Sequence, residues 1–211
     1  MAPRSGLRIV PLTIDRFDDL AALFREGGDP RWCFCMYWRL RGKDFSAATV
    51  AKNRARLRDL AGGPLAPGLV AYRGDRAVGW CSLGPREDFE RLERSRFIPR
   101  VDDQAVWSIV CFAVSKSARG EGVAAVLLEA ATAWAGEQGA KILEAYPVDT
   151  ETGTLINPDA AFMGTLPMFE RAGFRVVSAT AATAAGRPRV VVRRDLRSGP
   201  SARLTTARSD R

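Results

Sequence analysis

The chain has 211 residues, of which 46% are hydrophobic and 27% charged, which is enough for one well-filled core and few for two. It contains no histidine, and this excludes Ser-His-Asp and Cys-His catalysis. The net charge of +8 comes mostly from residues 187–211, which hold eight Arg and two Asp, so it reflects a basic chain end more than a basic face for nucleic acid.

The first half of the chain reads as a strand, two helices and two strands. Residues 7–12 predict the first strand, and a helix capped by Thr13 or Asp15 extends to about Arg25. A second helix is expected over residues 46–60 with Ser46 as its cap. Residues 68–73 and 77–83 flank Gly74-Asp75, a good hairpin turn.

The second half continues with a charged surface helix within residues 85–96 and a buried central strand over residues 105–114. An amphipathic helix over residues 121–138 is followed by a strand (142–146), a long connection (148–161), a helix (163–172) and a final hairpin (174–180 and 189–194). This order predicts a mixed α/β fold with a largely antiparallel sheet of six to seven strands and helices on both faces.

The cysteines and the apolar runs indicate the compartment. Cys81 and Cys111 lie in apolar runs, where reduced thiols act as small hydrophobes, and Cys33 and Cys35 are too close for a good disulfide. Without histidine or a second pair, Cys33-x-Cys35 is a poor zinc site, so no metal is expected. No apolar run predicts a membrane span or a signal peptide, and we expect a cytoplasmic protein.

The most informative stretch joins the central strand to the amphipathic helix. Arg119-x-x-Gly122-x-Ala124 follows the strand and opens the helix. The first helical turn presents unpaired N–H groups and a partial positive charge, and glycines allow close approach, so the turn predicts a pyrophosphate cradle. The spacing fits neither a P-loop nor a dinucleotide fingerprint.

This stretch resembles the acyl-CoA pyrophosphate motif of the GNAT acyltransferases. The later stretch from Phe169 to Phe174, which includes Gly173, resembles the closing helix of that family and its Gly-Phe ending. The resemblance implies a GNAT domain over residues 1–196, with a sheet splayed at its centre, and leaves residues 197–211 as a flexible basic tail. It implies acetyl-CoA as co-substrate and an N-acetyltransferase activity.

The resemblance also implies which residues bind CoA. The pantetheine arm would pair with the backbone of the central strand at Phe112 and Val114, around Ala113, like an added strand. The pyrophosphate would meet the amides of the following loop, and two residues of the closing helix region would complete the site. The loop residues are Arg119, Gly120, Glu121, Gly122, Val123 and Ala124, and the other two are Thr165 and Phe169.

The acceptor amine must lose a proton, so a base or a water relay is needed. Where several family members place a glutamate on the central strand, this chain has Ser108, a predicted catalytic-site residue that cannot be that base directly. The candidate bases are Glu144 and Asp149, with Asp88 as a further candidate. A solvated, outward-facing Glu144 is the competing interpretation. The tyrosine that usually protonates the CoA thiolate is replaced by Phe169, and Thr165 or Tyr146 are possible substitutes, unless the thiolate leaves without an acid.

The acceptor pocket is expected at the loop between the first two helices, which in the family usually lines it. That loop contains Trp32, Cys35, Trp38 and Arg39, which suit an aliphatic or aromatic amine through cation–π and sulfur–aromatic contacts. Filling of the core between the helices is the alternative interpretation of these residues.

Three functions follow from these features. The first is direct transfer of an acetyl group to a small primary amine, the second is acetylation of a protein lysine or N-terminus, and the third is an inactive acyl-CoA sensor, favoured by Ser108 and Phe169. Specific nucleic-acid or membrane binding is not expected, and a homodimer stays open.

Overall fold

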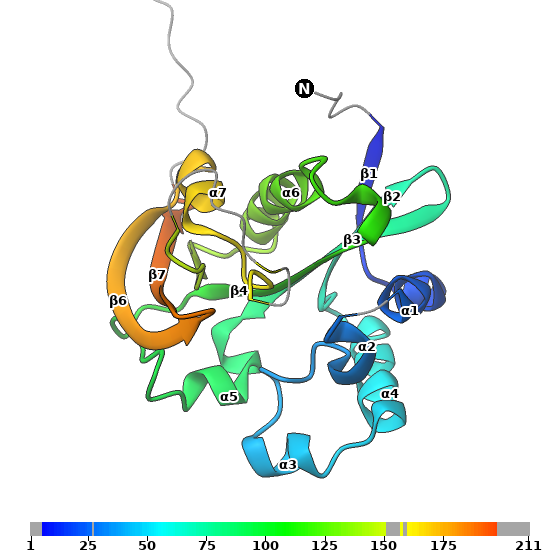
Figure 1. The fold of residues 1–211 in the computed structure, drawn as a ribbon, viewed down its shortest axis with the longest axis horizontal. Coiled ribbons are helices and arrows are strands. Elements are labelled where there is room, and N and C mark those ends of the chain that lie inside the picture. The colour runs from blue at the N-terminus through cyan, green and yellow to red at the C-terminus, as the bar shows by residue number, and fades with distance from the viewer. Residues whose placement is uncertain (1–5, 27, 151–156, 158–159, 198–211) are drawn as a thin grey trace, which may run out of the picture.

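The structure is a computed structural model that describes residues 6–197 except residue 27, residues 151–156 and residues 158–159 (Figure 1). The predicted tail over residues 197–211 therefore lies almost wholly outside the described residues. The strands are β1 (Leu7–Pro11), β2 (Gly68–Arg73), β3 (Arg76–Pro85), β4 (Trp107–Val114), β5 (Ile142–Ala145), β6 (Arg175–Ala184) and β7 (Arg187–Asp195). The helices are η1 (Ile14–Arg16), α1 (Phe17–Arg25), α2 (Pro30–Cys33), α3 (Gly42–Ser46), α4 (Val50–Ala61), η2 (Arg86–Asp88), α5 (Glu90–Glu93), η3 (Lys116–Ala118), α6 (Val123–Glu137) and α7 (Leu166–Arg171).

The strands form one seven-stranded sheet in the order β1-β2-β3-β4-β5-β7-β6. Neighbouring strands are antiparallel except for β4 and β5, which are parallel. The predicted mixed α/β class and the largely antiparallel sheet of six to seven strands are confirmed. Within the described residues, no helix is long and apolar enough to cross a membrane.

The sheet is splayed between β4 and β5. β4 pairs with β5 only through Trp107–Ile109. Directly beyond this point β4 contains a bulge, because Leu83 of β3 lies opposite Ile109 whereas Ser82 lies opposite Cys111. A bulge bends its strand, so the two central strands separate there and leave an edge of β4 without a neighbouring strand.

Helices cover both faces of the sheet (Figure 1). On β2, Val70 and Tyr72 face the core under α1 and α4, whereas Leu69 and Ala71 face the core under α6. Gly79 on β3 allows α6 to pack closely, because a Cβ there would lie 2.7 Å from Cγ1 of Val123. The fold thereby fixes the start of α6 against the central strands.

Two predicted helices differ from the structure. The helix expected over residues 46–60 is two helices, since Ser46 ends α3, where its hydroxyl donates to the carbonyl of Gly42, and Thr49 caps α4. The segment within residues 85–96 is not simply a surface helix, because Phe89 and Leu92 are fully buried there. Both errors arise where short helices carry too few residues for periodicity to place their ends.

Replacing Thr49 with alanine is expected to lower the free energy of unfolding by about 1 kcal/mol, because the Thr49 hydroxyl accepts from the backbone N–H of Lys52 over 3.2 Å. Ser46→Ala is the matched control, and it is expected to change that free energy by less than about 0.5 kcal/mol because the Ser46 hydroxyl donates back to a carbonyl of its own helix and satisfies no free N–H at a helix start. Urea denaturation of both variants measures the difference. Equal losses would contradict the cap assignment.

Candidate active site

The loop that leads into α6, residues 119–124 (the amide loop), has the geometry of an anion cradle. Gly120 and Gly122 have φ values of +80° and +81°, in the left-handed region that favours glycine. Within the described residues, no backbone carbonyl accepts from the N–H groups of this loop, and the first helical bonds run from Ala125 and Val126 to the carbonyl of Gly122. The N–H groups are thus available at the positive end of the helix dipole.

The side chains of the amide loop lie around this cradle. Arg119 is exposed and its Nε donates to the carbonyl of Val114 over 3.4 Å, while Glu121 forms an ion pair with Arg73. Val123 is buried in the core under α6 and Ala124 packs against it. Arg119 is therefore the one cationic side chain of the loop, and the remaining predicted contacts depend on backbone groups.

The edge of β4 beyond the bulge, residues 112–114 (the β4 edge), turns backbone groups toward the splay. The Ser115 N–H donates to the carbonyl of Val78 on β3, and because backbone groups alternate along a strand, Phe112 and Val114 direct their N–H and C=O groups to the other side. There the Phe112 N–H donates to the carbonyl of Phe162 over 2.6 Å. A ligand can form hydrogen bonds with this part of the edge only if the Phe162 carbonyl moves away from the Phe112 N–H.

Two residues predicted to contact CoA lie beside the β4 edge at the start of α7. Thr165 precedes the helix and bridges to Val148 beyond β5. Phe169 is fully buried, with its ring 6.2 Å from that of Phe112 and 5.1 Å from that of Phe174. Phe169 thus packs against Phe112 of the β4 edge, and its side chain has no hydroxyl that could donate a proton.

Three of the predicted catalytic residues meet in the interior. The hydroxyl of Tyr146 lies 2.7 Å from Oγ of Ser108 and donates to Oε1 of Glu144 over 2.6 Å. All three side chains are fully buried, so the interpretation of Glu144 as a solvated carboxylate is wrong. Burial, together with the charge of Glu144, raises the pKa of the Tyr146 phenol well above its usual value.

Two arginines bind both oxygens of Glu144. Arg86 donates to Oε1 over 2.6 Å, and Arg193 donates to Oε2 over 2.7 Å while also pairing with Asp102. Arg86 is 1% exposed and also donates to the Tyr146 hydroxyl. The sequence analysis predicted a role for neither arginine. Arg86 could have been noticed as a charged residue directly after the buried run of β3. Arg193 could have been noticed in the alternating pattern of β7.

The fourth predicted catalytic residue, Asp149, lies apart from this cluster. It is half-buried beyond the end of β5, where its backbone N–H donates to the carbonyl of Pro188 over 2.8 Å. The structure therefore separates the two candidate bases: Glu144 is enclosed by guanidinium groups, and Asp149 lies beyond the end of β5 beside β7.

A cavity of about 1270 Å³ opens beside the splayed strands. Three of the four predicted acceptor residues line it, namely Trp32, Cys35 and Trp38. Cys111 of β4 and Phe162 line it too, so the cavity extends from residues 32–39 (the aromatic loop) to the residue directly before the β4 edge. Glu144 and Tyr146 are absent from the described lining residues.

The fourth predicted acceptor residue, Arg39, does not line this cavity. Its side chain is buried, pairs with Asp88 at 3.5 Å and stacks over the ring of Phe89 at 4.5 Å. Burial lowers its pKa and the neighbouring Asp88 opposes that shift. Through these contacts with Asp88 and Phe89, Arg39 connects the aromatic loop to the segment after β3. The sequence did not predict this structural role.

The thiols beside the cavity are poorly suited to carry an acyl group. Cys35 does not readily ionise to the thiolate, because its contact with Cys111 and its complete burial raise the pKa of its thiol. The pKa of Cys33 is also raised, first by its hydrogen bond with Cys35 and then by burial. Since the thiolate is the nucleophile, neither residue has the environment of an activated cysteine.

Comparisons with known proteins agree with this architecture. The model of the Acetyltransferase (GNAT) family matches residues 23–174. A search of curated proteins found no match. Among solved structures, a Corynebacterium glutamicum protein named histone acetyltransferase HPA2 and related acetyltransferase has 22% identity and a TM-score of 0.53, over 90% of this chain and 96% of the other. The PaiA N-acetyltransferase from Thermoplasma acidophilum, in complex with coenzyme A, has 11% identity and a TM-score of 0.51, over 90% and 98% of the two chains.

The identities to these structures are low, so the structural likeness concerns the fold alone. The family match is of a different kind, because it covers most of the chain and includes the amide loop, the β4 edge and α7. From these observations together, the chain belongs to the GNAT acetyltransferase family.

Proposed function

We propose that this protein transfers the acetyl group of acetyl-CoA to a primary amine of a small molecule, by direct attack while both substrates are bound. The observation that carries the proposal is the position of the cavity next to the β4 edge: Cys111, the residue before that edge, lines the cavity, and so does Phe162, whose carbonyl accepts from the Phe112 N–H. A cavity that ends at the predicted thioester position suits an acceptor that enters from the aromatic loop.

The residues around the splay fit a CoA molecule. The available N–H groups of the amide loop suit its pyrophosphate, with Arg119 as a charge-assisted partner. The β4 edge offers the backbone of Phe112 and Val114 for strand-like pairing with the pantetheine amides, once the Phe162 carbonyl yields. Bound in this way, acetyl-CoA supplies an activated acetyl thioester.

The chain would then hold the amine in line with the acetyl carbon, which accounts for a large part of the rate. The amine nitrogen bonds to that carbon, the carbon–sulfur bond breaks, the sulfur leaves as the thiolate, and the amine proton passes to a base. We infer that Glu144 is not this base, since both of its oxygens bind arginines. Asp149, directly or through water, is the remaining predicted candidate. The raised pKa values of Cys33 and Cys35 favour direct attack over an acyl-cysteine.

Acetyl-CoA turnover, read as release of free thiol, is expected with one class of small amines and at least about tenfold more slowly with lysine peptides or whole proteins, because the acceptor is proposed to bind in a cavity that several separated segments of the chain line. The measurement is kcat/KM across amines, amino acids, antibiotics and lysine peptides. Calorimetry with CoA provides the binding control.

Three contrary results of this experiment would favour another function or contradict the proposal. Faster acetylation of peptides or proteins would favour the protein acetyltransferase, as the name of the C. glutamicum structure suggests. Tight CoA binding without any turnover would favour the sensor. Failure to bind CoA would contradict the proposal altogether.

A further inference from the structure

The cavity beside the β4 edge carries more positive than negative charge. Two acidic residues, Asp29 and Glu90, are among the described residues that line it. Five arginines line it as well, and four of them are exposed or half-buried near its opening. These four are Arg41, Arg91, Arg94 and Arg96. An acceptor that carried only an amine would find little charge complementarity here.

The fifth arginine, Arg189 of β7, is buried, with 4% of its surface exposed. Its guanidinium donates to two backbone carbonyls, that of Tyr146 over 3.0 Å and that of Ala160 over 2.8 Å, and it stacks on the ring of Phe162 at 5.1 Å. No carboxylate in the described part of the chain lies within 4.0 Å of it. Burial lowers its pKa to about 10.

Three other arginines of the described chain whose side chains are little exposed have carboxylate partners. Arg86 and Arg193 each pair with the carboxylate of Glu144, and Arg39 pairs with Asp88. Carbonyl groups satisfy the donors of a guanidinium but do not neutralise its charge, so among the residues that the structure describes Arg189 keeps a buried charge that an anion would compensate.

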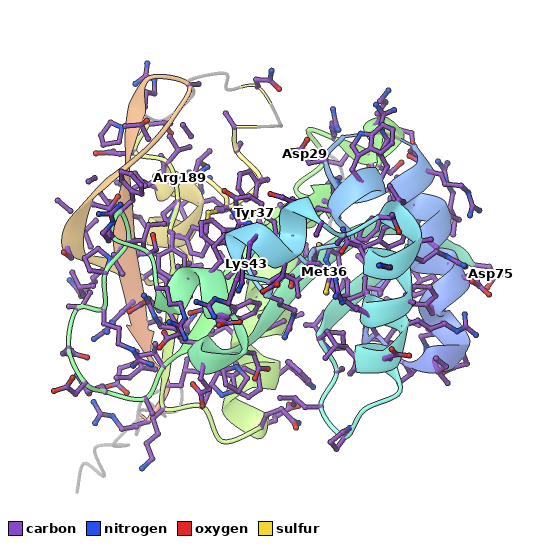
Figure 2. All side chains as sticks on the ribbon, turned by 90° about the horizontal axis from the view of Figure 1, so that it is seen from below. Asp29, Met36, Tyr37, Lys43, Asp75 and Arg189 are labelled. Carbon is purple, nitrogen blue, oxygen red and sulfur yellow. The ribbon has the colours of Figure 1, made fainter. Side chains whose placement is uncertain are left out.

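Arg189 is close to the predicted point of transfer. The Phe162 ring lies under its guanidinium, and the Phe162 carbonyl accepts from the Phe112 N–H of the β4 edge. Phe162 therefore contacts both Arg189 and the β4 edge, where the thioester is predicted to bind. Tyr37 lines the same cavity as Arg189, and Figure 2 labels both residues. The exposed aromatic surface of Trp32 and Tyr37 suits an apolar group on the same ligand.

We propose that Arg189 anchors a carboxylate of the acceptor, so that the amine is acetylated on a small amino carboxylic acid with an apolar side chain. This inference rests on the proposed acetyltransferase function and names its substrate class. The fork of the guanidinium suits a carboxylate, and the anchor would hold the amine of the same molecule near the β4 edge.

The test compares each acid with its carboxamide, using phenylalanine and phenylalaninamide, and leucine and leucinamide. Rates are expressed per unprotonated amine, because the carboxamides have less basic amines. The wild-type protein is expected to favour the acids by about 10- to 100-fold in kcat/KM, the effect of a hydrogen-bonded charge pair. Arg189→Gln is expected to reduce this preference to about twofold or less.

Arg175→Gln is the matched control, because it removes an exposed arginine of β6, the strand beside β7, that does not line the cavity. It is expected to retain the preference for acids. CoA affinity measured by calorimetry checks that Arg189→Gln is folded, since no residue of the amide loop lines the cavity. A merely structural Arg189 would slow acids and carboxamides equally, and that result would overturn the anchor.

A second measurement uses only the wild-type protein. In the presence of CoA, 3-phenylpropionate is expected to bind at least about tenfold more tightly than 3-phenylpropionamide, by calorimetry. Equal binding of the two would overturn the anchor even if the variant failed to fold. Turnover of amines without any preference for acids would do the same while leaving the acetyltransferase proposal intact. Absence of turnover with every amine would contradict that proposal alone, because the calorimetric comparison still tests the anchor.

Discussion

Gly122→Asp is expected to raise the dissociation constant for CoA at least about 100-fold, because it places a carboxylate at the cradle for the pyrophosphate. Like charges in contact at a binding site cost several kcal/mol, and 100-fold corresponds to about 2.7 kcal/mol. Isothermal calorimetry with CoA measures the change. Acetyl transfer should fall with CoA occupancy, since the amide loop holds the co-substrate rather than the acceptor.

Two control variants separate the charge from its side effects. Gly122→Ala tests the backbone, because a residue with a Cβ at φ of +81° costs about 1–2 kcal/mol of stability while its Cβ meets no atom within 4 Å. It should weaken CoA binding less than tenfold. Gly136→Asp adds the same charge near the other end of α6, where a Cβ also meets no atom, and should leave CoA binding unchanged. If Gly122→Asp bound CoA as well as Gly136→Asp does, the amide loop would not be the pyrophosphate site.

The sequence predicts the parts of this protein whose signals are local. The amide loop and α6 follow from glycine spacing and a helical apolar stripe, and the seven strands follow from short runs bounded by turns. The splay was expected through the family resemblance, and the structure explains it by a bulge between Ile109 and Cys111. No residue type marks that bulge, since its cause is the register between two strands.

The parts that could not be predicted depend on contacts between distant segments. Arg86 and Glu144 are 58 residues apart, yet they share a hydrogen bond in the core. Arg189 lies beside Phe162 only because β7 pairs with β5 and the chain returns across the splay. A charged residue in sequence is usually taken as exposed, and only tertiary structure shows that these are buried.

Glu144→Gln is expected to lower the free energy of unfolding by about 3 kcal/mol, because it leaves the charges of Arg86 and Arg193 in the interior with one partner fewer. For a chain of this size that corresponds to a fall in Tm of roughly 6–12 °C. Thermal unfolding followed by circular dichroism measures it. Glu90→Gln is the matched control, since Glu90 is 41% exposed and its ion pairs with Arg41 and Arg94 lie at the surface, and it should change stability by less than about 0.5 kcal/mol.

The same variant distinguishes a structural glutamate from a catalytic base. Far below its melting temperature, Glu144→Gln should keep kcat within about threefold of wild type, with the pH dependence of kcat unchanged, because the base would be another group. A base at this position would instead give a variant of normal stability, with kcat reduced about 100-fold or more and the limb of the pH profile that reports the base abolished. Only the first pattern is consistent with a carboxylate whose two oxygens bind guanidinium groups that tie the end of β3 and the centre of β7 to β5.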